Sequence, residues 1–254
     1  MGEYILGTEE RRRLELLEQC LDPITTRSLD AIGVGPGWRC LEIGGGGGSV
    51  TRMLCERAGP VGRVEVVDLD TRFLDEVEAG NLEVQRRDVV AEGLPGKGYD
   101  LIHTRMLLVH LPTRDKFIEE MVAALRPGGW LLCEELDCFP IDTLASGLYG
   151  EVWNAVISAF DTGGMATTFG RELPDLFNQA ALEDVEVTCE VPVYKGGSTF
   201  AQVTTASVAQ LRPLVLAAGA TEAQLEEFER LMDDRTQWFH HFAVYSVRGR
   251  TSAS

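Results

Sequence analysis

The residues best suited to bind a ligand lie in one stretch, where Glu42 is followed two positions later by five consecutive glycines, 44–48. An apolar segment precedes this run, and a helix-like segment, 50–58, follows it. The order predicts a strand that turns sharply into a helix, because glycine adopts positive φ at low cost and lets a ligand approach the backbone. A flexible linker is the alternative, but it does not account for the apolar strand and the amphipathic helix on either side.

Spacing decides which ligand such a turn would serve. The dinucleotide fingerprint requires Gly-x-Gly-x-x-Gly, and each register of the run places Ser49, Val50 or Thr51 at the third glycine. The phosphate loop requires a lysine followed by Ser or Thr, and no lysine lies nearby. The stretch reads instead as acid-x-Gly-x-Gly-x-Gly, beginning at Glu42.

This order resembles the first motif of class I S-adenosylmethionine (SAM) methyltransferases. SAM carries no phosphate, so no lysine is needed, and its positive sulfonium and amino groups are compatible with a carboxylate at the strand end. The chain departs from the family at Gly45 and Gly47, where Cys or Ala and Thr are usual. Glycine can adopt the backbone of either residue, so we expect binding to survive with a looser turn. The resemblance implies that the cofactor lies against Glu42, Gly44, Gly45, Gly46 and Gly48.

A second acid lies about 20 residues beyond the glycines, at the end of an expected strand, 63–67. Asp68 is in the position that holds a ribose in nucleotide-type folds, and the resemblance places Leu69 beside the cofactor. A simple strand-end turn is the alternative for Asp68. Asp70, or Thr71 after it, is better explained as the N-cap of a helix, 71–77.

A third strand, 81–87, ends at Asp88 and Val89. The resemblance implies that the Asp88 carboxylate accepts a hydrogen bond from the adenine amine and that the Val89 N–H reaches a ring nitrogen. The string Leu-Arg-Pro-Gly-Gly-Trp, 125–130, resembles the turn before the fifth strand of small-molecule methyltransferases. Its proline and glycines stop a helix and reverse the chain.

His103 is the candidate general base, because it ends the expected fourth strand and its side chain titrates near neutral pH. Packing against the cofactor, or a hydrogen bond to a neighbour, is the alternative role for His103. Glu135, with Glu134 and Asp137, could assist the base or orient a substrate amine. His110 lies in an expected helix, 105–110, and is interpreted as structural, whereas His240 or His241, on the expected last strand, could face the pocket.

Strands and helices alternate five times over residues 38–136. This alternation predicts a doubly wound, largely parallel sheet with ligands at the carboxyl ends of its strands. We expect a Rossmann-like α/β fold of seven strands whose last strand is antiparallel. The chain is expected to form a single domain, with an N-terminal helical lid (1–37), a SAM-binding core (38–136) and a helical region (137–181). In its last part (182–254) two strands, 184–194 and 238–247, flank a helical cap, 198–234.

The N-terminal lid is expected to consist of two helices. Asp22-Pro23 separates them, and the second spans 25–32. Tyr4 is interpreted either as part of a lid over the cofactor or as an anchoring aromatic residue of the terminus.

Composition limits the partners. A formal net charge of -17 disfavours nucleic acid as substrate, because duplex binders carry a basic surface. The six cysteines include no C-x-x-C, and the four histidines have no metal-ligand spacing, so no metal site is expected. The charged first twenty residues and the lack of a long apolar run predict no signal peptide and no membrane span. A cytoplasmic protein is expected, and a homodimer is the one assembly considered.

Together these features predict a SAM-dependent methyltransferase that acts on a small, partly apolar acceptor such as a secondary metabolite. The acceptor atom, oxygen, nitrogen or carbon, stays open. Two other functions fit the same motifs: a cyclisation or rearrangement without methyl transfer, since fold does not dictate chemistry, and a regulatory protein that binds SAM without catalysis.

Overall fold

The computed structural model describes residues 8–253. Tyr4 lies outside the described residues, so the lid interpretation of this residue stays a prediction. The chain divides into two compact units. The core unit comprises Leu21–Glu135, Arg171–Thr188 and Tyr245–Ser254, and the second unit comprises residues up to Cys20, Leu136–Gly170 and Cys189–Val244.

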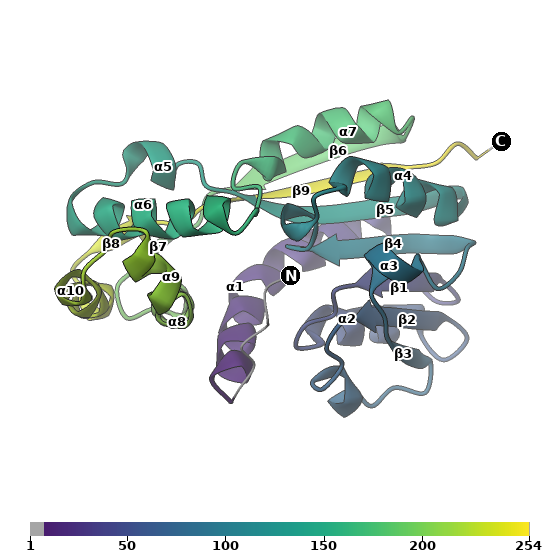
Figure 1. Cartoon of the computed structure of the whole chain (residues 1–254). Helices are drawn as coiled ribbons and strands as arrows, with labels where there is room; N and C mark the ends of the chain where they lie inside the picture. Colours follow the sequence, from purple (N-terminus) through teal and green to yellow (C-terminus); the bar gives the residue numbers. More distant parts are fainter. Residues whose placement is uncertain (1–7, 254) are drawn as a thin grey trace. The chain divides into compact units, whose positions relative to one another are not determined.

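A seven-stranded sheet has the strand order β3-β2-β1-β4-β5-β9-β6, and Figure 1 shows β9 running beside β5. Strands β1 to β5 are parallel, and the last strand, β9, is antiparallel, which confirms the predicted Rossmann-like fold. The strand bounds are β1 Arg39–Ile43, β2 Arg63–Asp68, β3 Leu82–Arg86, β4 Tyr99–Arg105, β5 Leu125–Asp137, β6 Glu183–Glu190 and β9 Ala243–Arg250.

Helices connect the strands of the core unit. The apolar faces of the first two helices and the strands β1, β2, β4 and β5 share one buried cluster that includes Leu29, Leu54 and Leu101. The helices and 3-10 turns are α1 Thr8–Ile32, whose second half belongs to this unit, α2 Ser49–Ala58, η1 Leu74–Glu76, α3 Val89–Glu92, η2 Leu108–His110, α4 Arg114–Ala124 and α7 Leu173–Gln179.

The predicted break at Asp22-Pro23 is wrong, because α1 is one continuous helix with Pro23 inside it. A proline within a helix removes a hydrogen bond and clashes with the preceding turn, at a cost of ~3 kcal/mol. Leu21 and Ile24 beside it are 1% and 4% exposed. Burial of a large apolar side chain stabilises by roughly 1.5–3 kcal/mol, so the flanking pair offsets the cost of the proline.

Two expected helices are also wrong. In place of 71–77 only the 3-10 turn η1 forms, and Asp70 accepts from the backbone N–H and the guanidinium of Arg72 instead of capping a helix. In place of 105–110, β4 continues through Arg105, and Met106 then takes a φ of 53° before η2 begins. Both segments follow a strand end, where local hydrogen bonds compete with a helical turn.

The turn at 126–129 is a bulge within β5 rather than a loop before it. Tyr99 of β4 pairs with Leu125, whereas Leu101 pairs with Trp130, so the four residues between the two pairs are looped out. Gly129 has no room for a side chain there, because a Cβ would lie 2.6 Å from the Tyr99 carbonyl oxygen. Glycine therefore allows close approach of the two strands at this position.

The second unit contains helices together with a small antiparallel ribbon, β7 Val193–Lys195 and β8 Trp238–His240. The two single strands expected over 184–194 and 238–247 are therefore each divided in two, the first at Pro192, which has no N–H for a ladder. The helical insertion expected over 198–234 is present. The helices outside the core unit are α5 Ile141–Leu144, α6 Gly147–Thr162, α8 Thr199–Gln210, α9 Arg212–Ala217 and α10 Glu222–Asp233. The 3-10 turn η3 Phe169–Glu172 belongs to the second unit through Gly170 and to the core unit from Arg171.

The glycine run turns β1 into α2 with alternating backbone conformations. Gly44, Gly46 and Gly48 have φ of 81°, 53° and 87°, the left-handed region that other residues rarely adopt. These are the three glycines of the acid-x-Gly-x-Gly-x-Gly pattern. The looser turn expected at Gly45 is not seen, because a Cβ there would lie 2.5 Å from Val66 and 2.8 Å from Leu74.

We expect Gly45→Ala to lower the free energy of unfolding by about 1–3 kcal/mol, since a methyl group would overpack the contact with the Val66 and Leu74 side chains. Chemical denaturation of the two proteins measures the difference. Gly80→Ala is the matched control, because a Cβ at Gly80 meets nothing within 4 Å and its φ is not positive. Equal stability of the Gly45→Ala protein and the control would contradict the close packing.

Candidate functional site

Asp68 connects the end of β2 to the glycine run. One carboxylate oxygen accepts from the Gly46 N–H at 3.0 Å, and the other accepts from the Asp70 N–H at 3.0 Å. Burial raises the pKa of Asp68, and the two backbone hydrogen bonds act in the opposite direction. The predicted ribose residue thus lies at the glycine turn and holds the middle glycine in place.

Asp88 and Leu69 lie at neighbouring strand ends. Asp88 caps α3, and its carboxylate accepts from the Val90 and Ala91 N–H groups at 3.0 and 3.2 Å. Leu69 is 54% exposed, an unusual position for a large apolar side chain. The Arg86 guanidinium donates to the Leu69 carbonyl oxygen at 3.0 Å and ties the two strand ends together. Val89, the other predicted contact, is buried at the first turn of α3.

Glu42 is buried at the end of β1 and accepts a hydrogen bond from the Thr51 hydroxyl of α2. Its carboxylate lies 3.9 Å from Nδ1 of His103, which the sheet register places opposite it. Glu42 therefore connects the end of β1 to the start of α2, the helix that follows the glycines, and in this way supports the turn between them.

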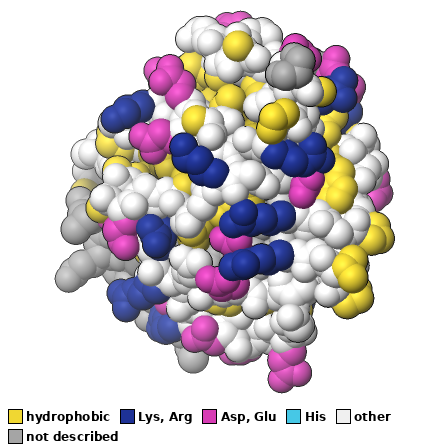
Figure 2. All heavy atoms as spheres, turned by 90° about the vertical axis from the view of Figure 1, so that its right-hand side faces the viewer, with side chains coloured by type: hydrophobic (Ala, Val, Ile, Leu, Met, Phe, Trp, Pro, Cys, Tyr) yellow, Lys and Arg dark blue, Asp and Glu magenta, His cyan; other side chains and the backbone are white. Residues whose placement is uncertain are grey.

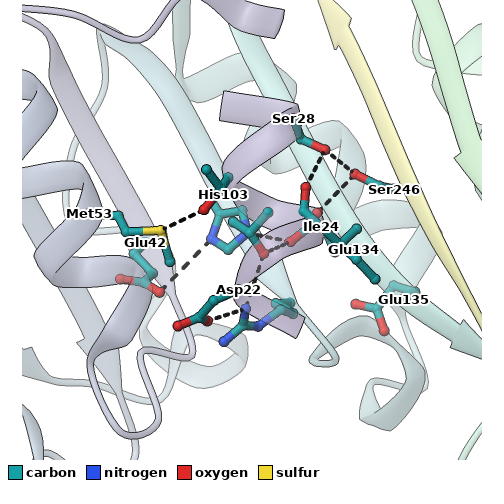
Figure 3. A network of polar contacts seen from close by, with 12 residues as sticks. Asp22, Ile24, Ser28, Glu42, Met53, His103, Glu134, Glu135 and Ser246 are labelled. Atoms are coloured by element: carbon teal, nitrogen blue, oxygen red, sulfur yellow. Dashed lines mark hydrogen bonds and ion pairs between the residues drawn. The ribbon is translucent and has the colours of Figure 1, made fainter. Parts of the chain in front are cut away.

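His103 is completely buried between two glutamates, as Figure 3 shows. Its Nε2 lies 3.4 Å from Glu134, whereas Nδ1 has no hydrogen-bond partner among the described residues. The role of His103 as a general base stays a prediction. Its present contacts are those of a side chain that fixes the ends of β1, β4 and β5.

Glu134 connects four elements. Besides His103, its carboxylate accepts from the Thr25 hydroxyl of α1 and, at 2.9 Å, from the Ser246 hydroxyl of β9. Burial would raise the pKa of Glu134, but the hydrogen bond and charge of His103, with the charge of Arg105, outweigh it and lower the pKa. Ser246 in turn shares a hydrogen bond of 2.7 Å with Ser28. The second half of α1 is thereby fixed to the sheet (Figure 3).

Arg105 extends these contacts to the glycine run. Its guanidinium donates to Asp22 and Thr25 at 3.0 Å each, and the Ser49 hydroxyl donates to the same Asp22 at 2.8 Å. These residues were missed at the sequence level, where Asp22 was taken as a helix break and Arg105 as the start of a helix. The helical spacing of the polar residues 22 and 25 could have indicated a shared inward face.

The Glu135 carboxylate contacts the turn after β4. Its carboxylate accepts from the N–H groups of Leu107 and Leu108, at 3.1 and 2.8 Å, and from that of Val109 at 3.4 Å. Burial raises the pKa of Glu135 to about 8, although these hydrogen bonds act to lower it. Glu135 thus secures the turn after β4, and its catalytic role stays a prediction.

The raised pKa of Glu135 predicts a pH-dependent stability. The folded protein retains a proton, up to pH about 8, that the unfolded chain releases near 4.5, so this contribution is complete below pH 4.5 and is lost as the pH rises to 8. The free energy of unfolding should fall more steeply with pH in the wild type than in Glu135→Gln, by at most ~1.4 kcal/mol per unit. Denaturant titrations from pH 5 to 8 measure both slopes. Glu119→Gln, an exposed glutamate of α4, is the control. Parallel slopes for wild type and Glu135→Gln would contradict the assignment.

The remaining candidates lie elsewhere. Asp137, His240 and His241 belong to the second unit, whereas His110 ends η2 of the core unit. Among residues 8–253 no group of three or more His, Cys, Asp or Glu side chains could hold a metal ion. No helix in the described part of the chain is long and apolar enough to cross a membrane. Figure 2 shows one face on which basic and acidic side chains are interspersed.

Comparison with known proteins identifies the family. Residues 8–187 match the family model described as a methyltransferase domain. The chain belongs to this methyltransferase family. The match covers the glycine run, Asp68, Asp88 and the bulge at 126–129, and it confirms the resemblance to class I SAM-dependent methyltransferases, with SAM as cofactor.

Among curated relatives, the methyltransferase is 30% identical over 116 residues to a ubiquinone/menaquinone biosynthesis C-methyltransferase, UbiE, of Ectopseudomonas mendocina. This alignment covers 42% of the chain and 45% of the relative. A UbiE of Pseudomonas putida is 30% identical over 130 residues, 48% of the chain and 50% of the relative. The methyltransferase thus spans about half the length of the curated relatives that it matches.

Solved structures share the fold at low identity. A phosphoethanolamine N-methyltransferase 2 of Haemonchus contortus, in complex with SAM, matches 95% of this chain and 52% of its own, with a TM-score of 0.56 and 15% identity. A structure titled as the [4+2]-cyclase SpnF matches 93% of this chain and 82% of its own, with a TM-score of 0.55 and 16% identity.

The residues of the core unit fit SAM as cofactor. The three glycines with positive φ turn the backbone where a ligand must approach closely, and no phosphate-binding lysine accompanies them. Asp68 and Asp88 supply carboxylates at two adjacent strand ends, and the exposed Leu69 between them offers an apolar surface. This set matches a nucleoside with a positively charged tail better than it matches a phosphorylated ligand.

Proposed function

We propose that the protein transfers the methyl group of SAM to a small, partly apolar acceptor, for example a secondary metabolite. The observation that supports this most is the contact between Asp68 and the N–H of Gly46, the middle one of the three glycines with positive φ. An acid fixed to the glycine turn, at the switch point of a parallel sheet, suits a nucleoside-type cofactor.

Within this proposal each strand end has one role. Asp68 accepts hydrogen bonds from the ribose hydroxyls, and Leu69 covers one face of the adenine. Asp88 accepts from the adenine amine, and the Val89 N–H donates to a ring nitrogen. Glu42 supports the glycine turn indirectly, because its side chain is buried, at 2% exposure, and accepts a hydrogen bond from Thr51.

SAM, when bound, supplies an electrophilic methyl group on a sulfonium. The chain then has to exclude water and align the acceptor with that methyl group. Alignment of reacting groups can supply about 7–11 kcal/mol in well-oriented systems. The buried contacts of Glu134, His103 and Arg105 suit this task, because they hold the strand ends in one arrangement.

The acceptor atom is proposed to be carbon. Both curated relatives described above carry the printed name of C-methyltransferases. A carbon acceptor needs a proton removed either before or after transfer, and a positioned base contributes ~10²–10⁴-fold. His103 is the proposed base, acting with Nδ1, which has no hydrogen-bond partner among the described residues and lies 3.9 Å from the Glu42 carboxylate.

The general test is to incubate the protein with SAM and a panel of phenols, quinols and amines and to measure S-adenosylhomocysteine by mass spectrometry. Acceptor-dependent S-adenosylhomocysteine supports methyl transfer. Acceptor conversion without S-adenosylhomocysteine would mean a cyclisation or rearrangement, a reaction that the fold also permits. SAM binding with no product from any acceptor would favour a regulatory protein.

Asp68→Ala should weaken S-adenosylhomocysteine binding at least about ten-fold, because the substitution removes both the proposed ribose acceptor and the support of Gly46. Isothermal titration calorimetry measures the dissociation constant. Asp70→Ala is the matched control, since the Asp70 side chain is bonded to Arg72 instead. An unchanged dissociation constant for Asp68→Ala would refute the ribose assignment.

His103→Gln tests the base. If His103 removes the proton, kcat should fall about 10²-fold or more while the dissociation constant of S-adenosylhomocysteine changes little. A variant with full activity would show that His103 is not the base, and an equal loss of activity and cofactor affinity would show that it only supports the sheet.

A further inference from the structure

Met106 has a backbone conformation that is rare for a residue with a side chain. Its φ of 53° lies in the left-handed region, and such strain costs on the order of 1–3 kcal/mol. Met106 directly follows β4, and its N–H donates to the Glu134 carbonyl oxygen of β5 at 2.7 Å. The strand order reverses between β1 and β4, and ligands bind at this point in parallel sheets. The strained residue therefore lies at the end of the sheet where the cofactor is expected.

The side chain of Glu135 stabilises this strained turn. A left-handed residue followed by a right-handed one directs successive N–H groups toward one point, an arrangement called a nest. Leu107, which comes second, is right-handed, with φ of -107° and ψ of -48°. Oε1 of Glu135 accepts from the N–H groups of Leu107 and Leu108 at 3.1 and 2.8 Å, and Oε2 accepts from that of Val109 at 3.4 Å. The carboxyl group of Glu135 thus occupies the nest that the strained backbone creates.

Glu135 is completely buried, and burial is unfavourable for a carboxyl group. Its side chain takes no part in the contacts around Glu134 that Figure 3 shows, because successive side chains of a strand point to opposite faces. Burial raises the pKa of Glu135 to about 8, so the group holds a proton at neutral pH and still has an acceptor oxygen. One short turn therefore combines two unfavourable features, a strained residue and a buried carboxyl group.

The turn contacts the glycine run through Leu107. A Cβ built on Gly44 would lie 3.7 Å from Cδ1 of Leu107 and 3.8 Å from its Cβ and Cδ2, so the Leu107 side chain lies directly against Gly44. Gly44 is the first of the three glycines with positive φ in the run. Leu107 is only partly buried, so part of its side chain stays accessible beside the glycines. All these residues belong to the core unit, and a shift of the turn would move an apolar side chain at the glycine run.

We propose that Glu135 is a positioning residue for the cofactor: it fixes the turn after β4 so that Leu107 and Gly44 together form one wall of the SAM site. Glu135 acts through the turn and does not contact SAM, a role that differs from the catalytic one predicted from the sequence. The inference rests on the proposed position of SAM at the glycine run. It does not depend on which acceptor is methylated, so cofactor binding alone tests it.

The test measures S-adenosylhomocysteine binding to the full chain by calorimetry. Glu135→Leu keeps the approximate size of the side chain but removes both acceptor oxygens, so the dissociation constant should rise at least about ten-fold. Glu135→Gln retains an acceptor oxygen for the N–H groups of Leu107 and Leu108, and its dissociation constant should stay within about two-fold of the wild type. Rescue by glutamine separates support of the turn from attraction of the cofactor by a negative charge.

Leu107→Ala tests the same contact without changing a buried polar group. It should weaken binding about five-fold or more, because the apolar side chain beside Gly44 is lost. In the double variant Glu135→Leu/Leu107→Ala, the dissociation constant should stay within about two-fold of that of the weaker-binding single variant, since both residues act through one contact. If the two effects multiplied instead, Glu135 would not act through Leu107 and the proposal would be wrong.

Asp100→Leu is the matched control, because Asp100 accepts the backbone N–H of Arg39 at 2.7 Å at the opposite end of β4. This variant should lose stability and keep the dissociation constant of the wild type. Unchanged binding by Leu107→Ala or by folded Glu135→Leu, a glutamine variant as weak as the leucine one, or an equal loss in Asp100→Leu would each overturn the proposal. Asp68→Ala belongs in the same titrations: if it also binds like the wild type, the proposed position of SAM is refuted rather than the role of Glu135.

Discussion

The carboxylate of Glu134 imposes the strongest constraint on the core unit. A buried charge is tolerated only when hydrogen bonds replace its lost hydration. Here the replacements come from Thr25 of α1, His103 of β4 and Ser246 of β9. Loss of any one donor would leave the buried Glu134 charge without its full set of hydrogen bonds. The three elements α1, β4 and β9 therefore have to be positioned together against β5.

This constraint explains how α1 continues through a proline. Thr25 lies two residues after Pro23, and it can reach Glu134 only if the chain is already helical there. Asp22, one residue before the proline, is bonded to Ser49 and Arg105, which fixes the other side of the same turn. These hydrogen bonds on both sides of Pro23 stabilise the helix at the position where the sequence alone predicts that it ends.

The sequence was sufficient to predict the parallel sheet, the glycine turn and the acids at strand ends, because these depend on short-range pattern. Periodicity places strands, and only glycine suits the alternating positive φ at 44, 46 and 48. Asp68 and Asp88 were found because each lies at the end of an apolar segment that predicts a strand; Asp68 ends β2, and Asp88 comes two residues after β3. Their positions required no knowledge of distant contacts.

Features that depend on contacts between distant residues were not predictable in this way. Thr25 and Glu134 are 109 residues apart in the sequence, and the residues around each give no indication of contact with the other. The close packing of Gly45 depends on Val66 and Leu74, which come from another strand and a later turn. The bulge at 126–129 depends on how β4 and β5 align, although its glycines were visible as a turn.

Buried polar atoms without a hydrogen-bond partner among the described residues occur in both units, for example Nδ1 of His103 in the core unit and Nδ1 of His241 in the second unit. Around Glu134 each donor has an acceptor, so the arrangement is complete without a ligand and serves to hold the strand ends. These contacts lie within the core unit and join α1, β4, β5 and β9, so the chain itself fixes this end of the sheet.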